Sequence, residues 1–315
     1  MTNIYQPTPA NLDLAAQAIK DGKLVSFPTD TVYGLGANVY NSSAVANIFK
    51  AKERPLFDPL ISHIADIDFL KEYVETDDRA IALAKHFWPG PLTFVLKRKD
   101  NNPAVDLACA GLPSLAVRMP NHPVALELIR KSGVPIVAPS ANRFKTISPT
   151  TAQHVRDSLG DKVDMILDPC RIGVETTIID LTTPHIVILR AGGMAKEELE
   201  EFTGEKVYLS HDNPDMPKAP GQLLKHYAPR MPLRINVKEE DVGKDEFFIG
   251  FGNVSGAQLN LSPKGDLCEA AANLFAYMRE AEKHTEYKGI AMSPIPETGL
   301  GLAINDRIRR ASYKE

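Results

Sequence analysis

The sequence predicts a mixed α/β protein with two domains, and three observations lead to this prediction. Helical and strand-like hydrophobic patterns alternate over residues 1–210. A proline-dense stretch over 211–233 interrupts the alternation, and proline is disfavoured inside helices and central strands. A shorter β-α-β-α pattern over 234–315 is typical of a small doubly wound unit. We therefore expect a large N-terminal domain, a proline-rich linker and a small C-terminal domain with these bounds.

Hydrophobic spacing, cap residues and turn residues locate the individual elements. An amphipathic helix is expected from Asn11, a cap-type residue, to Asp21, with Gly22 as its terminator. Two runs rich in β-branched residues, 177–181 and 185–189, flank a Thr-Thr-Pro turn and predict a hairpin. Further helices are expected over 42–51, 79–87, 123–131, 151–159, 266–283 and 302–311, and further strands over 24–27, 92–96, 115–118, 134–138, 246–251 and 289–292.

The composition is that of a folded cytoplasmic protein. The 315 residues include 36 basic and 40 acidic side chains, a formal net charge of −4, and 43% are hydrophobic, so the chain can bury hydrophobic cores. The three cysteines, Cys109, Cys170 and Cys268, are widely separated and form no C-x-x-C pair, which disfavours a disulfide framework and a zinc site. No secretory signal pattern begins the sequence, and no apolar run reaches the roughly 18 residues of a membrane span. We expect a cytoplasmic location and no membrane contact.

Common catalytic and nucleotide motifs are missing from the sequence. It contains no G-x-x-x-x-G-K-[ST], and the Gly-Leu-Gly sequences at 34–36 and 299–301 lack the third small residue of the dinucleotide fingerprint. No H-x-x-H, paired acidic motif or G-x-S-x-G is present, so metalloprotease, glycosidase and serine hydrolase functions are unsupported. A bound nucleotide would have to be held by cationic side chains and loop donors.

A cluster of cations lies where the helix expected over 42–51 ends. Lys52 and Arg54, with Lys50 ahead of them, lie just before Pro55, and cations at the negative end of a helix often have only a solvated structural role. The apolar run 59–61 then takes the chain back into the core, which places both side chains at the mouth of a groove. Arginine binds phosphate in a bidentate manner, and lysine acts as a point charge. The pattern therefore favours an anion site.

Polar residues also follow the apolar strand expected over 134–138. Ser140 and Asn142 are ordinary turn residues, yet open α/β sheets bind ligands at such strand ends. Ser148 begins a second helical stretch, whose hydroxyls and free N–H groups suit phosphate oxygens. The turn over 28–36 adds hydroxyls and glycines that permit close backbone approach, although local Ser/Thr hydrogen bonds explain it equally well.

These motifs together resemble a known family. Lys52-Glu-Arg54-Pro, followed by Ser140-Ala-Asn142, closely resembles the K-x-R…S-x-N tetrad of the YrdC-like threonylcarbamoyl-AMP synthases. Segments 219–229 and 297–307 resemble the longer, two-domain branch, so the resemblance covers the whole chain. Five further segments look like that family and fall in its order: 28–35, 88–93, 117–120, 173–177 and 188–192.

The resemblance implies both a fold and a reaction. The fold is a YrdC-like twisted mixed sheet with helices and a concave basic groove, plus a small Rossmann-like doubly wound domain. The reaction combines L-threonine, bicarbonate and ATP into threonylcarbamoyl-AMP and pyrophosphate, with Mg²⁺ accompanying ATP. Other proteins then transfer the threonylcarbamoyl group to the tRNA adenosine next to the anticodon. Any contact of this chain with tRNA itself is expected to be weak.

The resemblance also implies roles for individual residues. The family commonly has Asn where Asp58 stands and Ser-Thr where Thr176-Thr177 stands. Asp58 would add negative charge near phosphates unless it acts through Mg²⁺, and metal ligands are otherwise unknown. Tyr227 is expected to act as a lid residue, since a labile mixed anhydride needs protection from water. The catalytic residues would be Lys52, Arg54, Ser140 and Asn142; the ATP contacts Lys52, Arg54, Asp58, Ser114, Ser140, Ser148, Arg190 and Tyr227; and the L-threonine contacts Thr31, His63, Arg118, the main chain at Ala138, and Thr176.

Two other functions remain open at this point. A non-catalytic RNA-binding module would use the same basic groove, but the chain lacks an aromatic stacking array and an overall basic excess. The cations of that groove would be Lys50, Lys52, Arg54, Arg118, Arg143 and Arg190. A carbamoylating enzyme that acts on carbamoyl phosphate would resemble the N-terminal region, but this chain lacks the Cys-rich and acylphosphatase-like modules of such enzymes. His63 and Arg118 also have ordinary explanations, as a half-buried histidine and as the partner of a carboxylate.

Overall fold

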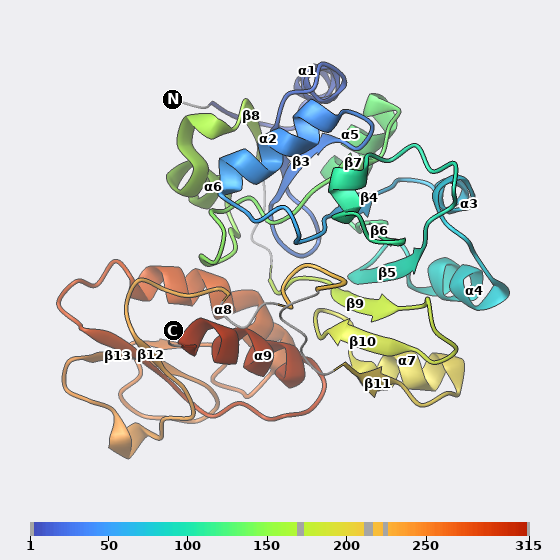
Figure 1. Cartoon of the computed structure of the whole chain (residues 1–315). Coiled ribbons are helices and arrows are strands. Elements are labelled where there is room, and N and C mark those ends of the chain that lie inside the picture. The colour runs from blue at the N-terminus through green and yellow to red at the C-terminus, as the bar shows by residue number, and fades with distance from the viewer. Residues whose placement is uncertain (1–2, 169–172, 211–216, 223–225, 314–315) are drawn as a thin grey trace.

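The computed structural model, which describes residues 3–168, 173–210, 217–222 and 226–313, contains a large mixed sheet and a smaller parallel sheet (Figure 1). The large sheet has the order β1-β8-β2-β3-β7-β4-β6-β5-β9-β10-β11, and the small one β12-β15-β13-β14. These two units confirm the predicted α/β class with two domains. The strands of the large sheet are β1 (Ile4–Tyr5), β2 (Val25–Phe27), β3 (Gly34–Asn38), β4 (Ile61–His63), β5 (Leu92–Lys97), β6 (Ser114–Arg118), β7 (Ile136–Val137), β8 (Met165–Leu167), β9 (Thr177–Asp180), β10 (Val187–Arg190) and β11 (Tyr208–Leu209).

Helices flank both sheets. The large domain contains α1 (Pro9–Lys20), α2 (Ser42–Lys52), α3 (Asp68–Tyr73), α4 (Asp78–Phe87), α5 (Pro123–Ser132), α6 (Ala152–Leu159) and α7 (Lys196–Thr203), with 3-10 turns at η1 (Asp106–Cys109) and η2 (Gly160–Lys162). The small domain contains strands β12 (Leu233–Arg234), β13 (Glu246–Gly250), β14 (Leu259–Asn260) and β15 (Gly289–Met292), the 3-10 turn η3 (Glu239–Asp241), and helices α8 (Leu267–Ala281) and α9 (Leu300–Ser312). Among the described residues, no helix has both the length and the apolar character needed to cross a membrane.

Two local predictions were wrong at the ends of elements. The first helix begins at Pro9, and its cap is Thr8, whose side chain accepts a hydrogen bond from the Asn11 backbone N–H at 3.3 Å. Proline suits the first helical position because its φ is fixed near the helical value, and this moves the start two residues ahead of Asn11. The strand expected over 134–138 shrinks to β7, because the prolines that flank it have no N–H to donate to the sheet.

The large sheet is covered by helices on both faces. Phe27 and Ile136 face a core formed with α1 and α5, whereas Leu35 and Val137 face a core formed with α2, α4 and α6. Neighbouring strand residues alternate between the faces, as the pleat requires. The central strands are therefore fixed from both sides, and the loops at their ends are held in place relative to one another.

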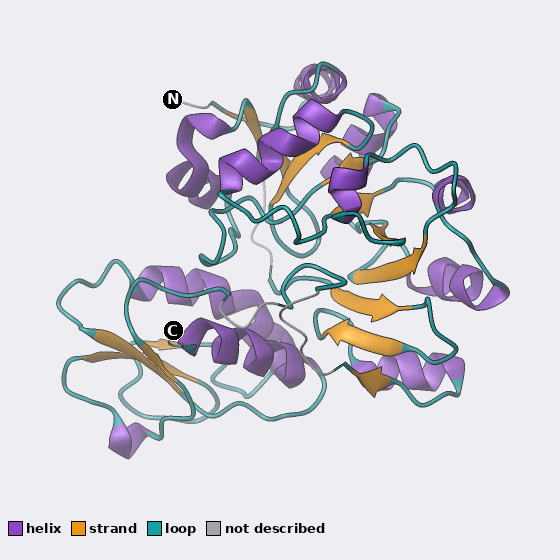
Figure 2. Cartoon of the chain, viewed as in Figure 1, coloured by secondary structure: helices purple, strands orange, loops and turns teal. Residues whose placement is uncertain are grey.

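The small sheet is parallel throughout, but its helices lie on one face only. Phe247 and Ile249 pack against α8 and α9, whereas Phe248 lies on the opposite face with Val237 and Ala291. Figure 2 shows the two helices side by side and loops around the rest of the sheet. The connections β12–β13 and β13–β14 contain no α-helix, so loops cover the second face. The two α-helices of the expected Rossmann-like unit therefore lie on one face of its sheet and not on both.

The described parts of the linker contact both domains. Ala219 is buried with Ile61 and Leu189 of the large domain, and Tyr227 is buried with Phe275 of α8. The remaining residues of the expected linker, 211–216 and 223–225, lie outside the described residues, as does Cys170. Cys109 is buried and Cys268 is exposed, and neither is in a disulfide.

The cap of α2 provides a test of this fold. The Asn41 side chain accepts a hydrogen bond from the Ala44 N–H at 3.0 Å, so Asn41→Ala should lower the free energy of unfolding by about 1 kcal/mol in urea denaturation. Asn47→Ala is the matched control, because Asn47 is exposed in the middle of the same helix, where alanine is the better helix former. Equal destabilisation by both changes would contradict the assigned cap.

Candidate active site

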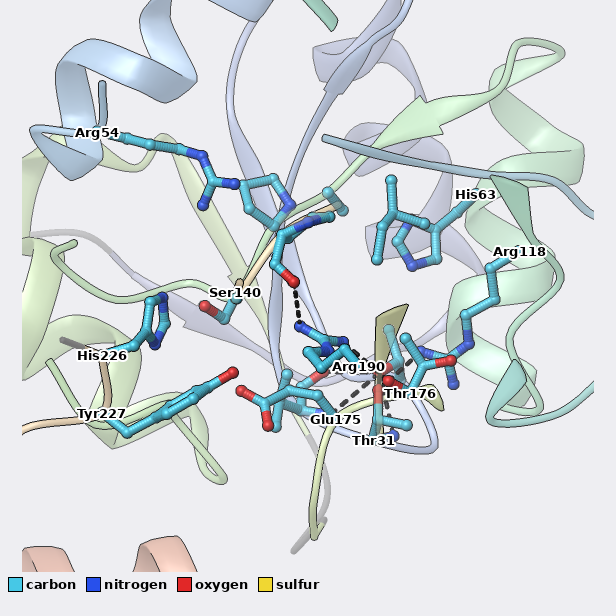
Figure 3. A pocket seen from close by; sticks show the side chains of 18 residues that line it. Thr31, Arg54, His63, Arg118, Ser140, Glu175, Thr176, Arg190, His226 and Tyr227 are labelled. Carbon is cyan, nitrogen blue, oxygen red and sulfur yellow. Dashed lines mark hydrogen bonds between the residues drawn. The ribbon is translucent and has the colours of Figure 1, made fainter. Parts of the chain in front are cut away.

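A cavity lies where several strand ends of the large sheet meet the linker (Figure 3). The segments that line it follow β2, end β4 and β6, follow β7, precede β9 and end β10. Nine of the predicted site residues line the cavity: Thr31, Arg54, His63, Arg118, Ala138, Ser140, Thr176, Arg190 and Tyr227. The sheet thus brings together residues that are up to 196 positions apart in the sequence, counted from Thr31 to Tyr227.

Lys52 supports the loop that carries Ser140 and Asn142. Its Nζ donates to the backbone oxygen of Ser140 in a short hydrogen bond and to that of Asn142 at 2.6 Å. The side chain is buried at 1% exposure, and burial holds the pKa of Lys52 well below its ordinary value, with Arg54 adding to the effect. The Asn142 amide in turn donates to the Thr146 backbone oxygen at 2.8 Å. An ammonium has three donors, so the two carbonyls occupy two of them.

Arg54 is held by Asp58, which lies four residues later in the sequence. Its Nη2 lies 2.8 Å from Asp58 Oδ1 and donates to the Pro59 backbone oxygen at 2.9 Å. Burial raises the pKa of Asp58, while Arg54 and Lys52 act in the opposite direction. Asp58 therefore reaches the site through Arg54, as the buried counter-ion of a guanidinium that lines the cavity.

Arg118 and Thr31 are joined on the other side of the cavity. Arg118 Nη1 donates to Thr31 Oγ1 at 2.8 Å, Nε donates to the Gly90 oxygen at 3.0 Å, and Nη2 forms a short ion pair with Asp30. The ordinary explanation of Arg118 as the partner of a carboxylate therefore holds, and Arg118 also lines the cavity. Sequence analysis missed Asp30, although it stands between two threonines of the turn over 28–36.

His63 is more deeply buried than the half-buried position expected of it. It is 3% exposed, and burial followed by the charge of Arg118 lowers its pKa to about 3. The imidazole is therefore neutral near neutral pH. It offers the cavity a polar but uncharged wall beside a cation.

Thr176 and Arg190 connect the sheet to the linker. Arg190 Nη2 donates to the Thr176 oxygen at 2.9 Å, and Nη1 donates to the oxygen of Pro220 in the linker at 3.2 Å. Gly221 follows with φ +83°, and a Cβ there would lie 2.9 Å from Arg190 Cδ and 3.0 Å from the Tyr227 hydroxyl. Glycine is therefore required where the linker crosses the arginine.

Tyr227 lines the cavity from the linker side (Figure 3). The centre of its ring lies 5.5 Å from that of the Phe275 ring of α8, and the two rings are stacked. Burial raises the pKa of Tyr227 to about 12, and burial together with the charge of Arg54 keeps the pKa of His226 well below its usual value. Both linker side chains are therefore uncharged at the cavity.

Glu175 is the main site residue that sequence analysis missed. It is the one carboxylate among the described residues that line the cavity. Ser148 Oγ donates to its Oε1 at 2.7 Å, so the predicted phosphate contact Ser148 joins the site through Glu175. Glu175 lies within segment 173–177, which resembles the family, but only Thr176 of that segment was assigned a role, because a lone glutamate in a loop has no recognisable pattern.

Ser114 lies apart from the other predicted residues. It begins β6, opposite Lys97 of β5, and borders a separate depression with Lys218. No group of three or more His, Cys, Asp or Glu side chains that could hold a metal occurs among the described residues.

The buried imidazole of His63 generates a prediction about pH. The pKa of about 3 in the folded protein, against 6.5 for an unperturbed histidine, means that the unfolded chain binds a proton below about pH 6.5 and the folded chain does not. His63 therefore destabilises the fold as pH falls from 7 to 5, by about 2 kcal/mol. His63→Gln should lose that much less unfolding free energy than wild type over this interval in urea denaturation, whereas the exposed-site control His185→Gln should behave like wild type. If the unfolding free energies of His63→Gln and wild type changed in parallel with pH, the lowered pKa of His63 would be refuted.

Comparisons with known proteins agree with this architecture. A family model named for Sua5, YciO and YrdC and described as telomere recombination matches residues 17–192, and one described as threonylcarbamoyl-AMP synthase, C-terminal domain, matches residues 194–312. The threonylcarbamoyl-AMP synthase of Pyrococcus abyssi is 42% identical, over 95% of this chain and 93% of that protein, and that of Bacillus subtilis is 38% identical, over 95% and 92%. The crystal structure of P. abyssi Sua5 complexed with L-threonine superposes with a TM-score of 0.90, covering 99% of this chain and 97% of that one at 38% identity. The chain therefore belongs to the threonylcarbamoyl-AMP synthase family.

Proposed function

We propose that this chain is an L-threonylcarbamoyladenylate synthase, which makes threonylcarbamoyl-AMP and pyrophosphate from L-threonine, bicarbonate and ATP. One observation carries the proposal: Arg54, Arg118 and Arg190 line a single buried cavity whose described lining has one carboxylate. Such a cavity suits a ligand set that is rich in negative charge, and a polyphosphate, a carboxylate and bicarbonate form such a set. The names of the two-domain relatives support the same reaction.

The chemistry fits a site without a nucleophilic side chain. The threonine amine and bicarbonate form a carbamate with loss of water. A carbamate oxygen then attacks the α-phosphorus of ATP, and pyrophosphate leaves. Such a displacement depends on positioning and on neutralising charge. We assign Arg54, Lys52 and the Ser140 loop to the phosphates, and Arg118 with Thr31 to the carboxylate side of threonine. The neutral His63 borders the amino acid without adding charge.

The linker supports protection of the product from water. The cavity leaves about 50 Å³ of free space, far less than the roughly 300–1,000 Å³ of pockets that hold small ligands. We propose that the segment that carries Pro220 and Tyr227 moves away to admit ATP. Its return would cover a mixed anhydride that water hydrolyses.

Mg²⁺ belongs to this proposal as the companion of ATP. The described lining offers Glu175 as its single carboxylate, and Arg307 already pairs with that side chain at 3.0 Å. We therefore assign the ion mainly to phosphate oxygens and water, which is common for Mg²⁺ bound with nucleotides.

The product is a substrate for other proteins in the cytoplasm. We propose that these proteins transfer the threonylcarbamoyl group to the tRNA adenosine next to the anticodon. A non-catalytic RNA-binding groove is not favoured, because Lys52 and Arg54 are 1% and 7% exposed, and phosphate backbones are gripped by accessible cations. Of the other cations weighed for such a groove, Lys50 is exposed and Arg143 pairs with Glu53 at 2.7 Å.

Pyrophosphate release tests the function. Release should require ATP, Mg²⁺, L-threonine and bicarbonate together. Arg54→Ala should lower kcat/KM by about 10²–10³-fold because it removes a cation from the cavity lining, and Lys52→Ala should do the same because it removes the support of the Ser140 loop. Lys50→Ala, an exposed change on the same helix, should stay within about twofold of wild type.

Folded wild-type protein that releases no pyrophosphate under these conditions would refute the synthase function. Steep salt dependence of tRNA binding, weakened by Lys50→Ala, would then favour the RNA-binding alternative.

A further inference from the structure

Glu175 and Arg307 form a buried ion pair that joins the two domains beside the cavity. Glu175 lies in the loop before β9, and Arg307 lies on α9, 132 residues later. Arg307 Nε donates to Glu175 Oε2 at 3.0 Å, and the two side chains are 0% and 7% exposed. A pair that is shielded from water in this way is strongly coupled, because removal of one partner leaves a buried charge uncompensated.

The same carboxylate holds a residue of the proposed ATP site. Ser148 Oγ donates to Glu175 Oε1 at 2.7 Å, so the two carboxylate oxygens link Ser148 to Arg307. The Glu175 backbone oxygen accepts from the Gly193 N–H at 2.9 Å, which fixes the loop itself. Arg279 of α8 adds a second connection from the small domain, since it donates to the backbone oxygen of Ser148 at 3.4 Å.

Arg307 also contacts the two other parts of the cavity wall. Its Nη1 donates to the oxygen of Ala191 at 2.6 Å, directly after Arg190, and to Asp306 at 2.8 Å. Its guanidinium lies 5.4 Å from the centre of the Tyr227 ring, within the range of a cation–π interaction. One side chain of α9 therefore connects the Glu175 loop, the end of β10 and the linker.

We propose that Arg307 and Glu175 are positioning residues of this active site, through which α9 holds the Ser148 hydroxyl and the Tyr227 ring at the place where nucleotide binds. The small domain then acts on catalysis by completing the geometry of a site whose other residues lie in the large domain and the linker. The inference rests on the proposed function for the identity of the nucleotide, and on the observed contacts for the positioning.

The test uses the full chain, four single variants and one double variant. Arg307→Met removes the charge and the directed donors, Arg307→Lys keeps the charge, and Glu175→Gln keeps the size of the side chain without its charge. Arg309→Met is the matched control, because Arg309 lies on the same helix, is 53% exposed and pairs with Glu297 at the surface. The three readouts are the affinity for α,β-methylene-ATP in the presence of L-threonine, the KM for ATP in pyrophosphate release, and amide hydrogen exchange over 217–222 and 226–229.

The expected result separates positioning from mere support of the fold. Arg307→Met should weaken analogue binding and raise the KM for ATP by about tenfold, and speed exchange over 226–229 while exchange in β5 and β6 stays as in wild type. Arg307→Lys should recover part of this loss, and Arg309→Met should stay within about twofold of wild type. The double variant Glu175→Gln/Arg307→Met should lower the affinity for the analogue by a smaller factor than the product of the two single-variant factors, since the two residues act together.

Folded Arg307→Met with wild-type affinity and wild-type exchange over 226–229 would overturn the proposal. If Arg307→Met does not fold, Glu175→Gln decides by the same two readouts. Wild-type protein that binds the analogue but releases no pyrophosphate would refute the proposed function alone, and the binding and exchange comparisons would still decide the role of the ion pair. If wild type does not bind the analogue, the exchange comparison decides it.

Discussion

The structure depends on pairing buried arginines with carboxylates. Arg54 meets Asp58, Arg118 meets Asp30 and Arg307 meets Glu175, each within ion-pair distance and each arginine nearly without exposure. An unpaired guanidinium at these places would carry a large desolvation cost. Pairing lets the cavity present several cations to a ligand while the protein remains folded in the absence of the ligand. Such pairs fix geometry more than they add stability, which is what a site that works by positioning requires.

Two other cations of the site are held by backbone oxygens. Lys52 and Arg190 donate to backbone oxygens, Lys52 to the loop after β7 and Arg190 to the ends of two segments that meet at the cavity. Each of these side chains therefore has a structural partner and a place at the site. Because Arg190 bonds to Pro220 of the linker, opening of the linker has to change the environment of a cation that lines the cavity.

Local patterns allowed much of the fold to be predicted, whereas most of the residue roles at the site came from the family resemblance. The i, i+2 spacing of Lys52 and Arg54 at a helix end, and Ser140 after a short strand, are features that a sequence displays directly. The sequence did not reveal that both α-helices of the small domain lie on one face of its sheet, because short connections and longer crossovers differ little in composition. Asp58 could be seen four residues after Arg54, but its role as counter-ion depends on the turn between them.

The parts that could not be predicted depend on long-range contacts. Glu175 and Arg307 meet across 132 residues and two domains, and no spacing rule connects them. Asp30 faces Arg118 only because β4 and β6 pair in parallel beside the turn that follows β2. Ser114 matched a family position, yet the pairing of β5 with β6 places it beside a different depression. Topology decided these positions.

We assign to this buried, charge-paired cavity the joining of three small molecules into one product. Mass spectrometry of the nucleotide formed from ATP, L-threonine and ¹³C-bicarbonate in the presence of Mg²⁺ tests this assignment. We expect threonylcarbamoyl-AMP that carries one ¹³C atom from bicarbonate. Formation of AMP without any nucleotide that carries the label, under conditions in which the protein is folded and binds ATP, would contradict it.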